Sequence, residues 1–187
     1  MTVTSRTDPP AQLLCISGSL RANSFNTKLV FVGGTIWPGP HLLANLRLPL
    51  YDGDLESEGI PEAVITLAAA IDAADAILIA TPEYNKSLSG VLKNALDWVS
   101  RIKGNPWKGK PVAIVSATGG RTDGERAQDA LRLAMNPFQP RLLTGPEVLV
   151  AAASGQFDDD GKLTEDRYLA KLNDLIGALH AAASSSA

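Results

Sequence analysis

Two stretches of this chain are almost continuously apolar, and they limit the folds that it can adopt. Residues 76–81 read Ala-Ile-Leu-Ile-Ala-Thr, and residues 112–117 read Val-Ala-Ile-Val-Ser-Ala. Neither stretch alternates polar with apolar residues, as a strand does when one of its faces meets water. Such runs are typical of strands that are buried on both faces of a parallel sheet.

Short β-type runs alternate with helical patterns along most of the chain. The helical patterns show apolar residues at the spacing i, i+3, i+4, i+7, which marks one buried face of a helix. The order predicts an α/β fold with a five-stranded parallel sheet in the order 2-1-3-4-5 and helices on both faces. The predicted strands are 12–17, 42–46, 76–81, 112–117 and 148–152, and the predicted helices centre on 64–71, 91–99, 127–134 and 168–179.

The segment between the first and second strands does not fit this pattern well. A helix should begin near Asn26, but Gly33-Gly34 and Pro38-Gly39-Pro40 interrupt it early. We therefore expect a truncated helix followed by a loop. For the chain as a whole, we expect a disordered N-terminal tail (1–11), a single domain (12–180) and a disordered C-terminal tail (181–187).

Composition narrows the functions that the chain can have. The formal net charge is −3, from 17 basic and 20 acidic residues, so we expect no attraction to nucleic acid or to an anionic membrane. No apolar run approaches the roughly 18 residues of a membrane span, and the N-terminus lacks a secretory pattern, so we expect a cytoplasmic protein. Cys15 lies in an apolar run and is expected to be a buried, inert thiol. Two isolated histidines, His41 and His180, argue against a metal site.

The loop after the first strand, Ser17 to Asn26, is rich in hydrogen-bond donors. It contains a single glycine, Gly18, and so does not match a dinucleotide fingerprint. Its hydroxyls, its amide and the guanidinium of Arg21 stand where a helix start would add free backbone N–H groups, and one monophosphate would satisfy them. An ordinary serine-rich turn, with Ser24 as the helix N-cap, explains the same residues equally well.

Two further polar loops follow the third and fourth strands. In the loop 81–90, Pro82 stiffens the chain, Tyr84 offers a flat aromatic face, and Asn85 could bond the edge of a heterocycle; Glu83 could instead only cap or pair locally. In the loop 116–124, paired glycines allow a ligand to approach the backbone closely. Because parallel strands end at one edge of a sheet, the three loops are expected to converge on one site.

Two other motifs are set aside. The segment 104–111 nearly matches a phosphate-binding P-loop, but Pro111 replaces the required Ser or Thr, and the segment precedes a strand instead of following one. The segment Asp158-Asp159-Asp160-Gly161 lacks the alternating ligands and the distal Glu of a calcium-binding EF-hand loop, so we interpret it as a surface turn.

The motifs 18–26, 81–85 and 90–101 together resemble the NAD(P)H-dependent FMN reductase family, whose relatives include chromate reductases, quinone reductases and azoreductases. The resemblance covers about residues 12–180. It implies a flavodoxin-like three-layer sandwich, FMN as cofactor, and a homodimer or homotetramer formed through the helix that carries Trp98. By this resemblance, the FMN-binding residues are Ser19, Arg21, Ser24, Phe25, Asn26, Pro82, Glu83, Tyr84, Asn85, Ser116, Thr118, Gly119 and Gly120.

The same resemblance implies a ping-pong reaction that needs no catalytic side chain and no metal. NAD(P)H, as NADPH or NADH, would pass hydride to flavin N5, and the oxidised nicotinamide would then leave. A small-molecule acceptor (a quinone, an azo compound, a metal oxyanion or a flavin) would bind in the place of the nicotinamide and be reduced by the flavin. Lys86 departs from the family pattern, which has a small or aromatic residue there, and Arg121 could meet the 2′-phosphate of NADPH or form a surface salt bridge. An electron carrier and a flavin-free regulatory module are the alternative functions.

Overall fold

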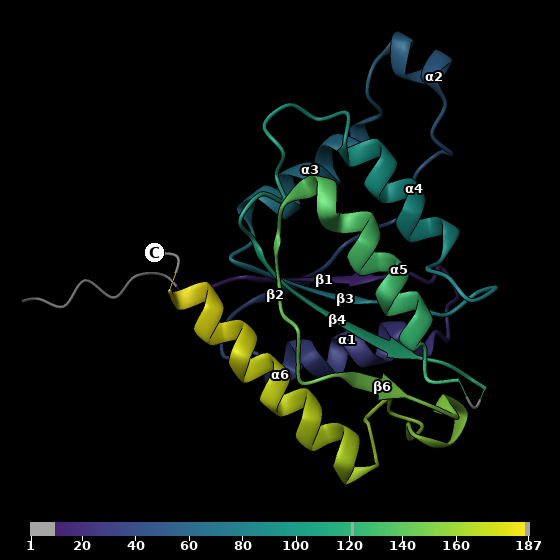
Figure 1. The fold of residues 1–187 in the computed structure, drawn as a ribbon, viewed down its shortest axis with the longest axis vertical. Coiled ribbons are helices and arrows are strands. Elements are labelled where there is room, and N and C mark those ends of the chain that lie inside the picture. The colour runs from purple at the N-terminus through teal and green to yellow at the C-terminus, as the bar shows by residue number, and fades with distance from the viewer. Residues whose placement is uncertain (1–9, 121, 186–187) are drawn as a thin grey trace, which may run out of the picture.

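The computed structural model describes residues 10–120 and 122–185, and in them the chain forms a parallel sheet of six strands (Figure 1). The strand order is β2-β1-β3-β4-β5, with β6 also paired to β4, so the predicted order 2-1-3-4-5 is confirmed. The strands are β1 (Leu13–Ser17), β2 (His41–Leu43), β3 (Ala76–Ala80), β4 (Pro111–Ala117), β5 (Arg141–Leu142) and β6 (Val148–Val150).

The outer strands are shorter than the sequence suggested. At one edge, β2 covers three residues, and the predicted continuation to Leu46 lies outside it. At the other edge, two short strands share one position, because β5 pairs with the start of β4 and β6 pairs with its end. The prediction of a single fifth strand over 148–152 was therefore incomplete: that strand ends at Val150, and its amino-terminal neighbour β5 was missed.

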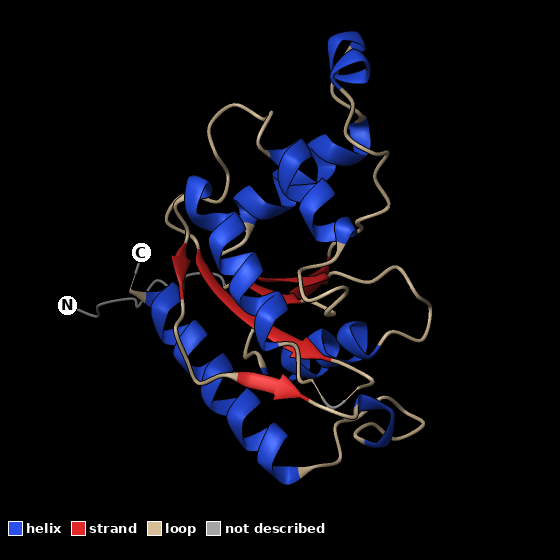
Figure 2. Ribbon diagram, turned by 45° about the vertical axis from the view of Figure 1, so that its right-hand side comes forward, coloured by secondary structure: helices blue, strands red, loops and turns tan. Residues whose placement is uncertain are grey.

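Helices cover both faces of the sheet and give the predicted three layers (Figure 2). One face packs against α1 (Phe25–Ile36) and α6 (Asp166–Ser184), and the other packs against α3 (Glu62–Ala73), α4 (Gly90–Val99) and α5 (Glu125–Met135). Successive residues of a strand point to opposite faces. In β1, Leu13 and Cys15 accordingly join the first cluster of buried side chains, whereas Leu14 and Ile16 join the second. Burial on both faces explains why these strands are continuously apolar.

The expectation of a truncated first helix was wrong. The helix α1 continues through Gly33 and Gly34 to Ile36, and both glycines are buried. A Cβ atom at Gly33 would lie 2.4 Å from Cδ2 of Leu78 on β3, and one at Gly34 would lie 2.6 Å from the ring of His41. The glycines therefore allow α1 to approach the sheet closely and do not break the helix.

The C-terminal end differs from the predicted tail, and most of the predicted N-terminal tail lies outside the described residues. The helix α6 includes Ala181 to Ser184, with Ala183 buried, so the predicted start of a C-terminal tail at residue 181 was wrong. Residues 186–187 and 1–9 lie outside the described part of the chain. No helix in the described part is long and apolar enough to cross a membrane.

One short helix stands apart from the layers. The helix α2 (Gly53–Glu58) buries none of its residues and extends away from the body of the molecule (Figures 1 and 2). Its base is fixed to α4, because Asn94 bonds both the Pro49 carbonyl oxygen and the Tyr51 N–H, at 2.9 and 2.8 Å. Two 3₁₀ turns, η1 (Asn136–Phe138) and η2 (Ala153–Gly155), complete the fold.

Candidate cofactor site

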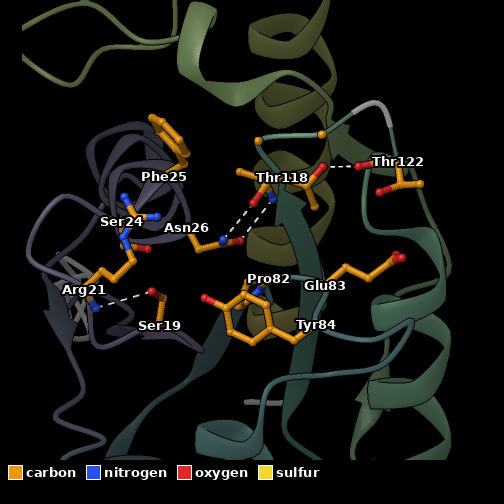
Figure 3. Close-up of a pocket in the computed structure, with 13 residues that line it drawn as sticks. Ser19, Arg21, Ser24, Phe25, Asn26, Pro82, Glu83, Tyr84, Thr118 and Thr122 are labelled. Atoms are coloured by element: carbon orange, nitrogen blue, oxygen red, sulfur yellow. Dashed lines mark hydrogen bonds between the residues drawn. The ribbon is translucent and has the colours of Figure 1, made fainter.

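Three loops meet at the carboxyl ends of β1, β3 and β4 and surround an open pocket, as the sequence predicted (Figure 3). The pocket brings together eleven of the thirteen residues named from the sequence. The predicted residues that line it are Ser19, Arg21, Ser24, Phe25, Asn26, Pro82, Glu83, Tyr84, Thr118, Gly119 and Gly120. Asn85 and Ser116 do not line it, and Ala117 and Thr122 line it without having been predicted.

The start of α1 forms one end of the pocket. Ser24 is the N-cap of this helix, and its Oγ accepts a hydrogen bond from the Thr27 N–H at 3.3 Å. The interpretation of Ser24 as an N-cap is thus confirmed, but it does not exclude an anion, because the hydroxyl hydrogen can still be donated. The first backbone N–H groups of a helix have no partner within the helix, so this end also carries partial positive charge.

The remainder of the first loop is held in shape by its own hydrogen bonds. The hydroxyls of Ser17 and Thr27 are 2.8 Å apart, and Arg47 donates to the Leu20 carbonyl at 3.0 Å. Arg21 is exposed, and its guanidinium reaches the Asn23 carbonyl only at 3.5 Å. Arg21 therefore brings a positive charge to this end of the pocket without being committed to a strong partner.

Asn26 links the first loop to the third. Its amide NH₂ donates to the Ala117 carbonyl at 2.8 Å, and its amide oxygen accepts from the Ala117 N–H at 3.0 Å. Only 3% of its surface is exposed. The amide oxygen and one N–H thus hold the end of β4 beside the start of α1, which is a positioning role that the sequence did not reveal. The contact of Asn26 with a phosphate stays a prediction. The second N–H of its side-chain amide is the donor that could make this contact.

The second loop provides the aromatic part of the pocket. Pro82 and Tyr84 lie on one side of it, and Glu83 lies away from the end that carries Arg21 (Figure 3). The Tyr84 side chain is 51% exposed, so its ring is available to a ligand and does not fill the core. Asn85 lies at the tip of the turn that follows and is not among the residues that line the pocket.

Hydrogen bonds of the buried Ser116 side chain support the third loop, which follows β4. The Ser116 hydroxyl donates to the Asp123 carbonyl at 2.6 Å and accepts from the Gln128 side chain at 3.0 Å. Ser116 is fully buried, so it supports the loop where a direct contact with the cofactor had been predicted. Thr118 donates to the Thr122 carbonyl, which closes the loop and puts Thr122 on the pocket wall. Arg121 lies outside the described residues.

Cys15 and Trp98 lie away from this chemistry. Burial raises the pKa of the Cys15 thiol to about 12, and this agrees with the expected inert thiol. Trp98 is fully buried, donates to the Pro49 carbonyl at 2.8 Å and lies edge-on to Tyr51. Trp98 is therefore covered by its own chain and is not the exposed contact that the sequence suggested. The described residues contain no group of three or more metal-ligating side chains.

Comparison with known proteins agrees with this geometry. Residues 11–155 match the family model described as NADPH-dependent FMN reductase. The chain belongs to this family. It is 42% identical over 171 residues to an NAD(P)H-dependent FMN reductase of Pseudomonas aeruginosa. This alignment covers 90% of this chain and 92% of the relative. It is 37% identical over 152 residues to a quinone reductase of Escherichia coli K12, at 79% and 81% coverage.

A solved structure supports the same assignment. The flavoenzyme NAD(P)H:(acceptor) oxidoreductase of Paracoccus denitrificans aligns with a TM-score of 0.84 and 31% identity, over 94% of this chain and 98% of its own. A WrbA-like flavodoxin of Agrobacterium tumefaciens, with a TM-score of 0.62 and 15% identity, shows the flavodoxin-like fold alone. As a member of the FMN reductase family, the chain has FMN as its cofactor.

The chemistry of the pocket fits FMN. At one end are two hydroxyls, a guanidinium and a helix N-terminus, which are suited to a phosphate. The other two loops contribute an exposed aromatic ring and a glycine pair, of which Gly119 has open space where a Cβ would stand. The cavity volume is about 190 Å³, below the roughly 300–1,000 Å³ of sites that enclose a ligand. A ligand of the size of FMN would therefore remain partly exposed to solvent.

Proposed function

We propose that this protein is an NAD(P)H-dependent oxidoreductase that holds FMN at the carboxyl edge of its sheet and reduces a small acceptor. The observation that carries the proposal is the combination of anion-binding and aromatic groups around one pocket. The start of α1 contributes hydroxyls and a guanidinium to the pocket, and the loop after β3 contributes an exposed aromatic ring to the same cavity, in a chain of the FMN reductase family. When bound, FMN accepts hydride from a nicotinamide and passes reducing equivalents to an acceptor.

The chain's own residues bind and orient the cofactor. Ser19, Arg21 and Ser24, which line the pocket, would hold the phosphate, and Tyr84 would pack beside the ring. Gly119 and Gly120 also line the pocket, and backbone N–H groups of this loop would favour added negative charge on a bound flavin. No side chain is assigned as a general acid. Because the pocket is open, the hydride donor and the acceptor use the same exposed side in turn.

A quinone is the acceptor that we propose first, because several relatives are named quinone reductases. The test is steady-state NADPH oxidation by the FMN-loaded protein with a benzoquinone, compared with an azo dye, chromate and free FMN. The proposal is supported if the kcat/KM for the benzoquinone is higher than the kcat/KM for each of the other acceptors. A loaded protein that oxidises NADPH with none of these acceptors contradicts it.

We also propose that the protein forms a homo-oligomer and works in the cytoplasm, where NAD(P)H is available. The oligomer is supported by the arm 49–58, which consists of α2 and the segment that precedes it. Leu50 on this arm is 82% exposed, and α2 buries none of its residues. Light scattering of the wild type and of Leu50→Ser tests this; a monomeric wild type would contradict it. Cell fractionation tests the location.

A further inference from the structure

The tip of the second loop is a tight two-residue turn. The Tyr84 N–H donates to the Ser87 carbonyl at 3.1 Å, and the Ser87 N–H donates back to the Tyr84 carbonyl at 3.1 Å. The two central residues, Asn85 and Lys86, have φ angles of 51° and 64°. Two consecutive positive φ angles between paired residues define a type I′ turn.

Lys86 is an unfavourable choice for this position. A type I′ turn prefers Asn followed by Gly, because a Cβ in the left-handed region crowds the next carbonyl oxygen. Asn85 meets this preference, but Lys86 does not. Its side chain is exposed, so the backbone cost is not offset by packing. The stability of the turn therefore does not explain the lysine.

Lys86 is exposed on the loop after β3, which also contributes residues to the pocket, and it has no ion pair among the described residues. Lys86 follows Glu83 and Tyr84, which both line the pocket, by three and two residues. The ion pairs found in the described residues involve Lys93, Lys162 and Arg167, not Lys86. Neighbouring Glu83 is the nearest acid in the loop sequence, and the two side chains form no ion pair. The ammonium group is therefore free for a ligand that arrives from solvent.

We propose that Lys86 recognises a phosphate monoester on the incoming substrate, first of all the 2′-phosphate of NADPH. This inference rests on the proposed function. Arg21 lies on a different loop, just before the start of α1, where the cofactor's own phosphate is proposed to bind. A substrate that approaches the pocket along the loop after β3 would meet Lys86. NADH lacks the 2′-phosphate, so Lys86 sets the preference between the two donors. Free FMN, as an acceptor, carries the same chemical group, and riboflavin does not.

The experiment measures KM and kcat of the FMN-loaded wild type and of Lys86→Gly, Lys86→Gln and Lys86→Arg with NADPH and with NADH. Glycine suits the turn, so Lys86→Gly removes the charge without straining the fold. We expect Lys86→Gly and Lys86→Gln to raise the KM for NADPH about tenfold, as the loss of one charge-assisted hydrogen bond would. The KM for NADH and kcat stay within about twofold, and Lys86→Arg retains the preference.

Lys108→Gln is the matched control. Lys108 is an exposed lysine that precedes β4, at the opposite edge of the sheet from the pocket, so its loss leaves both KM values unchanged. A second arm holds NADH as donor and compares FMN with riboflavin as acceptors. A selective loss for FMN there assigns the recognised phosphate to the acceptor as well.

The proposal is overturned if Lys86→Gly and Lys86→Gln keep the wild-type preference for phosphate-bearing substrates in both arms. It is also overturned if the wild type has no such preference, or if NADPH and NADH lose affinity equally. A failure of the proposed function looks different. In that case the wild type oxidises neither donor, whatever residue stands at position 86.

Discussion

The close approach of α1 to the sheet predicts opposite effects for two glycine-to-alanine substitutions. Gly33 faces Leu78, and a Cβ there would lie 2.4 Å from Leu78 Cδ2, whereas favourable carbon contacts are about 3.5–4.0 Å. Leu78 is fully buried, and its side chain would have to shift within the core to accept the Cβ. Gly177, in the exposed face of α6, would place its Cβ within 4 Å of nothing.

The magnitudes follow from two competing terms. Replacing a helical glycine by alanine stabilises the helix by about 1 kcal/mol. Overpacking a closed core costs about 1–3 kcal/mol. At Gly33 both terms act, and an overlap of more than about 1 Å puts the steric cost at the high end, so Gly33→Ala destabilises by about 1–2 kcal/mol. At Gly177 only the first term acts, so Gly177→Ala stabilises by about 1 kcal/mol.

Urea denaturation of both variants, followed by circular dichroism at a fixed FMN concentration, measures these changes. The FMN concentration must be constant, because a ligand that binds only the folded state adds to stability. In a thermal scan, the two variants should separate by roughly 4–12 °C, at about 2–4 °C per kcal/mol for a chain of this size. If Gly33→Ala stabilises the protein as much as Gly177→Ala does, the contact between α1 and Leu78 is wrong.

Three further predictions concern individual side chains. Arg21→Ala should weaken FMN binding at least tenfold in a fluorescence titration, because a charge-assisted hydrogen bond contributes about 1.5–3 kcal/mol; unchanged affinity would remove Arg21 from the phosphate end. Asn26→Ala should lower the free energy of unfolding by about 2–4 kcal/mol in urea, since it leaves the buried N–H and carbonyl of Ala117 without their partner; a loss below about 1 kcal/mol contradicts the positioning role. Cys15, whose pKa is raised to about 12, should resist iodoacetamide at pH 8 in the native protein, where about one thiol in ten thousand is ionised, and react once unfolded, as mass spectrometry would show; rapid native labelling would contradict its burial.

The central strands could be predicted from the sequence because their signal is local. Residues 76–80 are apolar without interruption, since both faces of β3 are covered, and no distant contact is needed to recognise this. The convergence of the three loops followed from topology, because parallel strands 1, 3 and 4 end at one edge.

What the sequence did not show depends on contacts between distant residues. The glycines of α1 resembled helix breakers, and only the position of Leu78 explains them. The amide of Asn26 resembled a ligand group, yet its partner Ala117 is 91 residues away. Ser116 was taken for a pocket residue because of its place in the chain, but whether its hydroxyl points into the pocket or toward Asp123 and Gln128 depends on the packing of α5.

The central claim is that one pocket binds the phosphate of FMN at the start of α1 and leaves a face of the ring open to a hydride donor. The most direct measurement is an absorbance titration of the purified protein with FMN, followed by anaerobic addition of NADPH. The account predicts saturable binding of one FMN per chain at micromolar concentration and bleaching of the bound flavin by NADPH. A protein that stays colourless with added FMN, or whose bound flavin NADPH and NADH leave oxidised, would contradict it.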